Sequence, residues 1–176
     1  MKFNNVENEC VQTTDGRTVW LSRSVAVVGI VCLIKDGYPH LLISQRGLGA
    51  ADNHLKYCLP CGYLDWSENS FDAVRREVWE ETGINIDLIL NNTWPVDKPF
   101  MVITDPSENR QNVSITHIVL SEIPKDGELP TPNITNHVQD QEVADARWIR
   151  YDEVDNFEFA FNHKERLKKF LTHIGY

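Results

Sequence analysis

The sequence contains little cysteine and no long apolar run. Four cysteines in 176 residues are too few for a disulfide framework. The longest mostly apolar stretch, Val25–Ile34, is too short to span a bilayer, and the residues after Met1 contain no apolar segment typical of a secretory signal. We therefore expect a cytoplasmic protein that does not associate with membranes.

An excess of positive charge is also missing. Lys and Arg number 17 against 26 Asp and Glu, which gives a formal net charge of −9 at pH 7. This balance argues against a protein that binds nucleic acid through a broad basic surface. It leaves open a polyphosphate substrate, because bound divalent cations invert the local charge.

No repeat, low-complexity tract or linker divides the chain, and its length predicts a single domain over residues 1–176. Apolar periodicity and turn residues predict strands over 25–34, 41–43, 84–90, 99–104, 113–120 and 142–149, with a loop over 47–61. A helix is expected from Asn69 or Ser70 to Thr82, ended by Gly83, and another from about Asn162. Mixed strands with interspersed helices indicate an α/β or α+β sandwich.

The first predicted helix carries the pattern most informative about chemistry. Each helical residue advances about 100°, so Glu77, Glu80 and Glu81 lie within about 100° of one another. Like charges at this spacing repel each other. A hard cation such as Mg²⁺ makes the crowding favourable, because it takes oxygen ligands and keeps open positions for water and phosphate. Such ions neutralise a diphosphate and activate water for attack. Arg76 is placed to pair with and orient Glu80.

The pattern around this helix resembles the motif of a known family. The matching residues are Gly62-x5-Glu68-x7-Arg76-Glu77-Val78-x-Glu80-Glu81-x-Gly83-Ile84. They resemble the Nudix box at every defining position, and the segments 41–46 and 142–154 resemble the flanking parts of that domain. Cys61 and Ser67 stand where many members have glycine. The resemblance implies a Nudix fold, a mixed β-sheet sandwiched between α-helices, and Mg²⁺- or Mn²⁺-dependent hydrolysis of nucleoside diphosphates linked to another moiety.

The resemblance also implies roles for individual residues. Those matching catalytic positions are Arg76, Glu77, Glu80 and Glu81. Those matching metal-binding positions, in part through a backbone carbonyl, are Gly62, Glu68, Glu77, Glu80 and Glu81. Glu77 serves as metal ligand or general base depending on the member, and Glu68 supports the loop or a further ion. A fourth carboxylate often comes from outside the box, and Glu142 is the leading candidate for it, followed by Glu122 and Asp140.

Several residues other than the row of carboxylates at Glu77, Glu80 and Glu81 have both a functional and a structural interpretation. Arg46 ends a strand that leads toward the box, so it contacts a phosphate or forms a structural ion pair. Tyr63 and Trp66 either stack on a nucleotide base or pack in the core. Cys58 and Cys61 form half of a zinc or redox motif, and since no second pair follows, buried packing is favoured.

These residues predict a Nudix-type hydrolase acting on the pyrophosphate bond of ADP-ribose, a nucleotide sugar or a dinucleotide. A nucleoside triphosphate pyrophosphatase is the alternative, because the box contacts only the phosphates. Removal of a 5′ cap from RNA is less favoured by the net charge of −9. A non-catalytic nucleotide-sensing or interaction module, or an isomerase on the same fold, is disfavoured by the intact box. Homodimers are common in the resembled family.

Overall fold

The computed structural model describes residues 7–89, 94–95, 97–106, 110–134 and 141–176. The strands are β1 (Glu9–Gln12), β2 (Thr18–Leu21), β3 (Val25–Lys35), β4 (Tyr38–Arg46), β5 (Tyr57–Cys58), β6 (Cys61–Tyr63), β7 (Met101–Ile103), β8 (Val113–Glu122) and β9 (Val143–Arg150). The helices are α1 (Ser70–Thr82) and α2 (His163–His173), with the 3-10 helices η1 (Ile86–Leu88) and η2 (Tyr151–Asn156).

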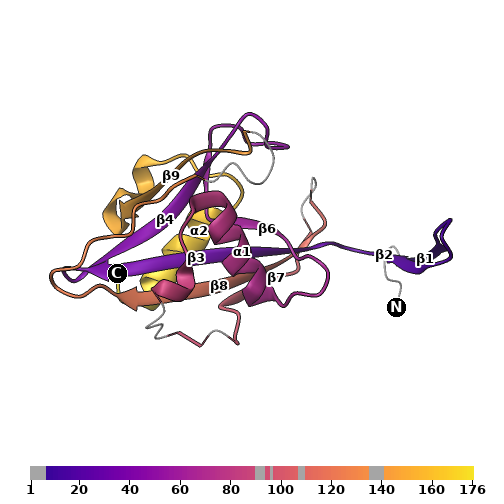
Figure 1. The fold of residues 1–176 in the computed structure, drawn as a ribbon, viewed down its shortest axis with the longest axis horizontal. Coiled ribbons are helices and arrows are strands. Elements are labelled where there is room, and N and C mark those ends of the chain that lie inside the picture. Colours follow the sequence, from indigo (N-terminus) through magenta and orange to yellow (C-terminus); the bar gives the residue numbers. More distant parts are fainter. Residues whose placement is uncertain (1–6, 90–93, 96, 107–109, 135–140) are drawn as a thin grey trace, which may run out of the picture.

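A mixed sheet forms the centre of the molecule (Figure 1). Its strands follow the order β5-β4-β3-β8-β7, with β6 paired to β3 and β9 paired to β4. β3 runs parallel to β8 and antiparallel to β4 and β6. The β3–β4 hairpin closes through Asp36 and Gly37, whose φ angles of 53° and 80° are those that a two-residue hairpin turn requires.

The two faces of the sheet are covered by different helices. Because side chains alternate along a strand, Val27 and Val31 of β3 pack in a core with α1, whereas Val28 and Ile30 pack in a core with α2. Phe170 of α2 is fully buried in the second core. The predicted mixed sheet between helices is therefore confirmed, and α1 is fixed against the sheet by its apolar side.

Two local predictions are wrong. The segment predicted as a strand over 84–90 contains η1 instead, and Leu90 lies outside the described residues. The side chain of Asn85 accepts a hydrogen bond from the N–H of Asp87 at 3.0 Å, and this cap favours a helical turn over an extended strand. The segment predicted as a loop over 47–61 contains β5 and the start of β6, short strands whose pairing depends on distant partners.

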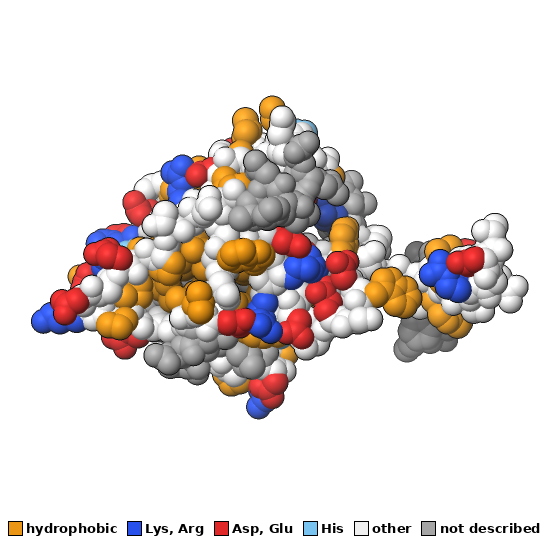
Figure 2. All heavy atoms as spheres, in the orientation of Figure 1, with side chains coloured by type: hydrophobic (Ala, Val, Ile, Leu, Met, Phe, Trp, Pro, Cys, Tyr) orange, Lys and Arg blue, Asp and Glu red, His pale blue; other side chains and the backbone are white. Residues whose placement is uncertain are grey.

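β1 and β2 form a separate two-stranded hairpin that stands away from the main sheet (Figure 1). Trp20 and Leu21 of β2 are 66% and 56% exposed. Figure 2 shows hydrophobic side chains on this projecting hairpin. No helix in the described part of the chain combines the length and the hydropathy that crossing a bilayer requires.

A buried histidine links α2 to the turn between β5 and β6. His163 is 3% exposed, and its Nδ1 accepts a hydrogen bond from the N–H of Leu59 at 3.1 Å. Burial lowers the pKa of His163 to about 3, with the charges of Arg166 and Arg46 acting in the same direction. The folded protein therefore holds His163 neutral at pH values where the unfolded chain takes up a proton.

We expect this histidine to make stability depend on pH. A depressed folded-state pKa means that stability is lost as pH falls below 6.5, the ordinary value, toward 3. Between pH 7 and pH 4.5 the loss from this group is about 2–3 kcal/mol. His163→Asn keeps a hydrogen-bond acceptor but removes the titrating group. The unfolding free energy of the variant, measured with denaturant, should therefore fall by about 2–3 kcal/mol less than that of the wild type over this pH range. Parallel stability–pH curves for the two proteins would contradict the assignment.

Candidate active site

Helix α1 presents the carboxylates and has well-defined ends. The side chain of Asn69 accepts hydrogen bonds from the N–H groups of Phe71 and Asp72 at 3.0 and 2.9 Å, which satisfies donors that a helix start leaves unpaired. Gly83 ends the helix with a left-handed φ of 69°. The predicted cap and terminator thus set both ends of α1. Acidic and basic side chains gather on the exposed face beside it (Figure 2).

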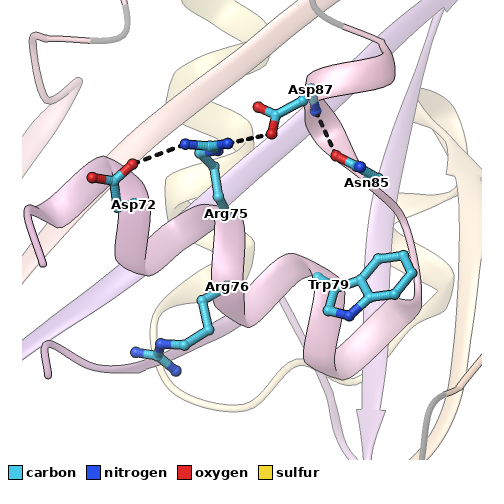
Figure 3. Close-up of a pocket in the computed structure, with 6 residues that line it drawn as sticks. All are labelled: Asp72, Arg75, Arg76, Trp79, Asn85 and Asp87. Atoms are coloured by element: carbon cyan, nitrogen blue, oxygen red, sulfur yellow. Dashed lines mark hydrogen bonds and ion pairs between the residues drawn. The ribbon is translucent and has the colours of Figure 1, made fainter.

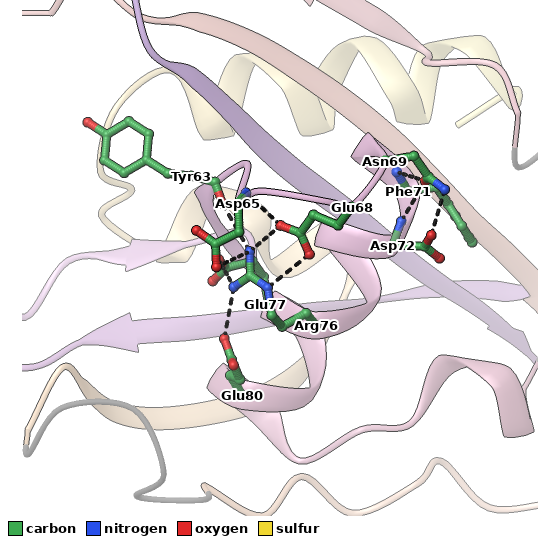
Figure 4. A network of polar contacts seen from close by, with 9 residues as sticks. All are labelled: Tyr63, Asp65, Glu68, Asn69, Phe71, Asp72, Arg76, Glu77 and Glu80. Atoms are coloured by element: carbon green, nitrogen blue, oxygen red, sulfur yellow. Dashed lines mark hydrogen bonds and ion pairs between the residues drawn. The ribbon is translucent and has the colours of Figure 1, made fainter. Parts of the chain in front are cut away.

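Arg76 lies at the centre of the acidic residues (Figure 4). Its Nη1 donates to Glu77 Oε1 at 2.6 Å and to Glu80 Oε2 at 3.1 Å. Its Nε and Nη2 donate to the carboxylate of Glu68 at 3.1 and 2.7 Å, and Nη2 also reaches the carbonyl oxygen of Tyr63 at 3.0 Å. One guanidinium thus donates hydrogen bonds to three carboxylates, pairs with a fourth, Asp65, at 3.7 Å, and ties the loop before α1 to the helix.

The loop before α1 is held from a second direction. Glu68 Oε1 accepts a hydrogen bond from the N–H of Asp65 at 2.7 Å, so Glu68 connects the loop backbone to Arg76. These contacts hold the loop against α1. The pKa of Glu68 is lowered, chiefly because Arg76 donates a hydrogen bond to it.

Glu81 points into the interior rather than toward Arg76. Its Oε2 accepts a hydrogen bond from the hydroxyl of Ser44 on β4 at 2.7 Å, and its Oε1 accepts one from the N–H of Cys61 on β6 at 3.3 Å. Burial raises the pKa of Glu81 well above its ordinary value, against the opposing effect of the Ser44 hydrogen bond. Sheet residues from two strands therefore fix the orientation of this carboxylate.

Glu77 lies directly against Gly62. A Cβ atom at Gly62 would lie 2.1 Å from Glu77 Oε1 and 2.3 Å from its Cδ, so the glycine is required by close approach. Burial raises the pKa of Glu77 to about 7, opposed by the hydrogen bond and charge of Arg76. The carboxylate and the Gly62 backbone therefore lie next to each other.

The candidates for a fourth carboxylate have different positions. Glu142 is close enough to Glu77 for its negative charge to raise the Glu77 pKa, and its carbonyl oxygen accepts a hydrogen bond from the N–H of Gly47 at 2.6 Å. Glu122 pairs with Ile34, at the far end of β3 from the Val27–Gly62 pair. Asp140 lies outside the described residues. Glu142 is therefore the candidate that the fold brings to the carboxylate row.

The donor groups fit a hard divalent cation in kind, because carboxylate oxygens are ligands that such a cation prefers. In the described part of the chain, no three His, Cys, Asp or Glu side chains are already arranged as metal ligands. Arg76 donates to Glu77 and Glu80, so a cation that binds these carboxylates competes with the guanidinium for them.

A second cluster of charge lies beyond the end of β4. Arg46 donates from Nη2 to Asp52 Oδ1 at 3.3 Å, and Arg110 pairs with the other oxygen of the same carboxylate. Both guanidinium groups lie over the ring of Phe161, at 5.2 and 4.4 Å from its centroid. Phe161 has a φ of 56°, which is strained for a bulky residue. The structural ion pair foreseen for Arg46 is therefore present.

The aromatic residues of the loop are open to solvent. Tyr63 is 55% exposed and Trp66 is 91% exposed, so neither packs in the core. Figure 4 shows the Tyr63 ring pointing away from the carboxylates. Cys58 is buried and Cys61 is half-buried, in line with packing as their main role, and both are free thiols.

A pocket on the outer side of α1 shares Arg76 with this site (Figure 3). Its volume is about 540 Å³. Its lining residues are Asp72, Arg75, Arg76, Trp79, Asn85 and Asp87. Arg75 spans it, donating to Asp72 at 3.0 Å and pairing with Asp87 of η1, while Arg76 points away. The polar groups of this pocket therefore mainly hold η1 against α1.

Sequence patterns did not reveal Ser44, Arg110 and Phe161 as parts of these clusters. Ser44 follows the buried residues Leu41–Ile43 of β4 and is buried with them, and the sequence does not show which side chain its hydroxyl reaches. The structure pairs Arg110 with Asp52 across 58 residues. A buried serine inside an apolar strand is the one signal that sequence could have offered.

Replacing Ser44 by Ala is expected to weaken both metal binding and turnover by about 10–100-fold, because residues that orient a metal ligand act at this scale. The change removes the hydrogen bond to Glu81 Oε2. Ser121→Ala is the matched control, since Ser121 is also buried but lies on β8 opposite Leu33. Titration with Mn²⁺ and steady-state kinetics measure the two effects. Equal behaviour of both variants would contradict an orienting role.

Comparisons with known proteins agree on the family and the fold. The family model described as NUDIX domain matches residues 23–173. NAD-capped RNA hydrolase NPY1 of Saccharomyces cerevisiae is 24% identical over 132 residues, which cover 71% of this chain and 28% of that protein. The chain thus spans less than a third of the length of this curated relative.

Solved structures share the fold at low identity. The NUDIX domain of Shewanella oneidensis NrtR, complexed with ADP ribose, has a TM-score of 0.68 at 16% identity, covering 88% of this chain and 90% of that one. A bifunctional NMN adenylyltransferase/ADP ribose pyrophosphatase from Francisella tularensis, complexed with AMP and Mn ion, has a TM-score of 0.62 at 22% identity over 88% and 42%. A C. elegans Ap4A hydrolase has a TM-score of 0.62 at 15% identity over 86% and 97%.

Proposed function

Because the chain belongs to the NUDIX domain family, we propose that it uses Mg²⁺ or Mn²⁺ to hydrolyse the pyrophosphate bond of a nucleoside diphosphate derivative such as ADP-ribose. The observation that carries the proposal is the row of Glu77, Glu80 and Glu81 on one helix, with Arg76 among them. The substrate class is supported by neighbours of the same fold described with ADP ribose. A cytoplasmic location fits the four free cysteines.

Bound at the Gly62 carbonyl and the carboxylates of α1, divalent cations would neutralise the diphosphate and polarise the phosphorus. Glu81 is held for this role by Ser44 and the Cys61 N–H. Arg76 keeps contacts with Glu68 and the Tyr63 carbonyl when it gives up Glu77, so it remains in place beside the site. The protein thereby supplies ligands whose positions are fixed before the substrate arrives.

The pair of arginines at Asp52 provides the substrate side of the proposal. Arg46 follows Ser44 by two residues on β4. Its positive charge therefore lies at the end of the same strand whose Ser44 hydroxyl orients Glu81. Arg46 and Arg110 contact opposite oxygens of the Asp52 carboxylate. A phosphate oxygen can replace Asp52 as the partner of the two arginines. Tyr63 and Trp66 are exposed, so either ring can stack on a nucleotide base.

Replacing Arg110 by Ala is expected to raise KM about 10–100-fold, since a charge-assisted hydrogen bond contributes about 1.5–3 kcal/mol. Arg150→Ala is the matched control, because Arg150 also pairs with an aspartate, Asp152, and lies over the Tyr38 ring at 4.9 Å. Steady-state kinetics on the preferred substrate measure both. An unchanged KM for the Arg110 variant would remove this pair from the substrate site.

The function is tested by product analysis on a substrate panel with Mg²⁺ or Mn²⁺. The panel contains ADP-ribose, NADH, dinucleoside polyphosphates, nucleotide sugars, nucleoside triphosphates and NAD-capped RNA. AMP plus a sugar phosphate from ADP-ribose, abolished by EDTA, is the expected result. Nucleoside monophosphate plus pyrophosphate from triphosphates alone would favour the pyrophosphatase alternative. No turnover on the whole panel by folded protein with metal present would favour a nucleotide-sensing role.

The β1–β2 hairpin supports the further proposal of a homodimer. A two-stranded hairpin on its own is at best marginally stable in water, and this one exposes Trp20 and Leu21. A second copy of the chain is the occupant that we propose for this apolar surface. Sedimentation equilibrium should give twice the chain mass for the wild type and the chain mass for Trp20→Glu. A monomeric wild type would contradict it.

A further inference from the structure

Two thiols lie behind the carboxylate of Glu81, and the proposed reaction does not use them. Cys58 ends β5 and is 2% exposed, whereas Cys61 begins β6 and is half-buried. Both are free, and they are three residues apart at the two ends of the turn that joins β5 to β6. A Cys-x-x-Cys spacing of this kind is one at which two thiols form a disulfide in other proteins.

The pair is connected to Glu81 by two routes. The Sγ atom of Cys58 lies 3.3 Å from Ser44 Oγ, and that hydroxyl donates to Glu81 Oε2 at 2.7 Å. The N–H of Cys61 donates to the other oxygen of the same carboxylate at 3.3 Å. Cys61 also precedes Gly62, whose backbone lies against Glu77. A change at either sulfur therefore reaches the groups that orient Glu81.

We propose that Cys58 and Cys61 form an oxidation site, at which a peroxide converts the thiol pair to an intramolecular disulfide that disturbs Glu81. A disulfide holds its sulfurs about 2.05 Å apart, well inside the contact distance of two thiols. Closing that gap draws Cys58 away from Ser44, and it turns the Cys61 backbone from Glu81 Oε1. The hydrogen bonds that orient the carboxylate are then lost or lengthened.

The chemistry balances with the peroxide as the oxidant. One thiol breaks the O–O bond and becomes a sulfenic acid, with release of one water. The sulfur of the other thiol attacks the sulfenic sulfur and forms the S–S bond. The sulfenic OH group leaves as a second water, which takes up the proton of the attacking thiol. The two thiols supply the two electrons that reduce the peroxide. A dithiol reductant reverses the step by exchange.

The test uses the full chain carrying Cys10→Ser, because Cys10 is exposed and would react independently. After peroxide treatment, intact mass should fall by about 2 Da, the mass of two hydrogens, and peptide mapping should link Cys58 to Cys61. Mn²⁺ affinity, measured by electron paramagnetic resonance without substrate, should fall about 10-fold or more, as expected when a ligand loses its orienting partners. Dithiothreitol should restore both values. Cys32, whose pKa burial raises to about 12, serves as the unreactive internal reference.

Cys58→Ala and Cys61→Ala, each in the same background, cannot form the bond. For each variant, peroxide treatment should leave the Mn²⁺ affinity nearly unchanged from its value before treatment. Absence of the 2 Da loss, or a disulfide without any change in Mn²⁺ affinity, would overturn the inference. Its effect on turnover rests on the proposed function, but the mass and Mn²⁺ readings do not. A protein that forms the bond and loses Mn²⁺ affinity yet hydrolyses no substrate would refute only the proposed function.

Discussion

Replacing Glu80 by Gln is expected to lower kcat by about 10²–10⁴-fold, because a bound metal ion contributes several kcal/mol of charge stabilisation to phosphoryl chemistry. Gln has nearly the same shape, and its side-chain oxygen can still accept the hydrogen bond that Arg76 donates to Glu80 at 3.1 Å. The fold should therefore be retained, with a change in unfolding free energy within about 1 kcal/mol. Glu81→Gln is expected to act in the same direction.

The measurement is steady-state turnover of the preferred substrate at saturating Mg²⁺, together with chemical denaturation. Glu165→Gln is the matched control, since Glu165 is an exposed glutamate on the other helix, α2. The control should keep wild-type turnover. If Glu80→Gln and Glu81→Gln both kept near-normal activity, α1 would not carry the active site.

Replacing Gly62 by Ala is expected to lower kcat by about 10²-fold, the scale at which a misplacement of about 1 Å affects catalysis. The added Cβ would lie 2.1 Å from Glu77 Oε1, so the carboxylate has to move. Moving it also strains the bond that Arg76 makes to Glu77 at 2.6 Å. The stability cost of the overpacked site is about 1–3 kcal/mol.

A Gly29→Ala variant distinguishes the displacement of Glu77 from general strain in α1. A Cβ at Gly29 would lie 2.9 Å from Val74 Cγ1 and 3.3 Å from Val78 Cγ2, on the apolar side of the same helix. This variant should lose a similar amount of stability while its kcat stays within a few-fold of wild type. Equal losses of kcat in both glycine variants would show that distortion of α1, rather than the position of Glu77, limits the reaction.

The local features of α1 could be predicted from the sequence because they depend on neighbours along the chain. Asn69 and Gly83 mark the helix ends through bonds that span only a few residues. The helical period then places Glu77, Glu80 and Glu81 on one side. The same local reasoning fails over 84–90, where apolar residues suggest a strand but the Asn85 side chain caps a helical turn.

The surroundings of the carboxylates were decided by the tertiary structure. Ser44 reaches Glu81 across 37 residues, and Arg110 reaches Asp52 across 58. Such contacts follow from which strands pair and in which register, and no periodicity within one segment specifies that. The sequence by itself therefore determined which residues carry the acidic charge and on which helix they lie. Only the folded sheet decided what orients each carboxylate, because its strands bring hydrogen-bond donors from distant segments to within about 3 Å.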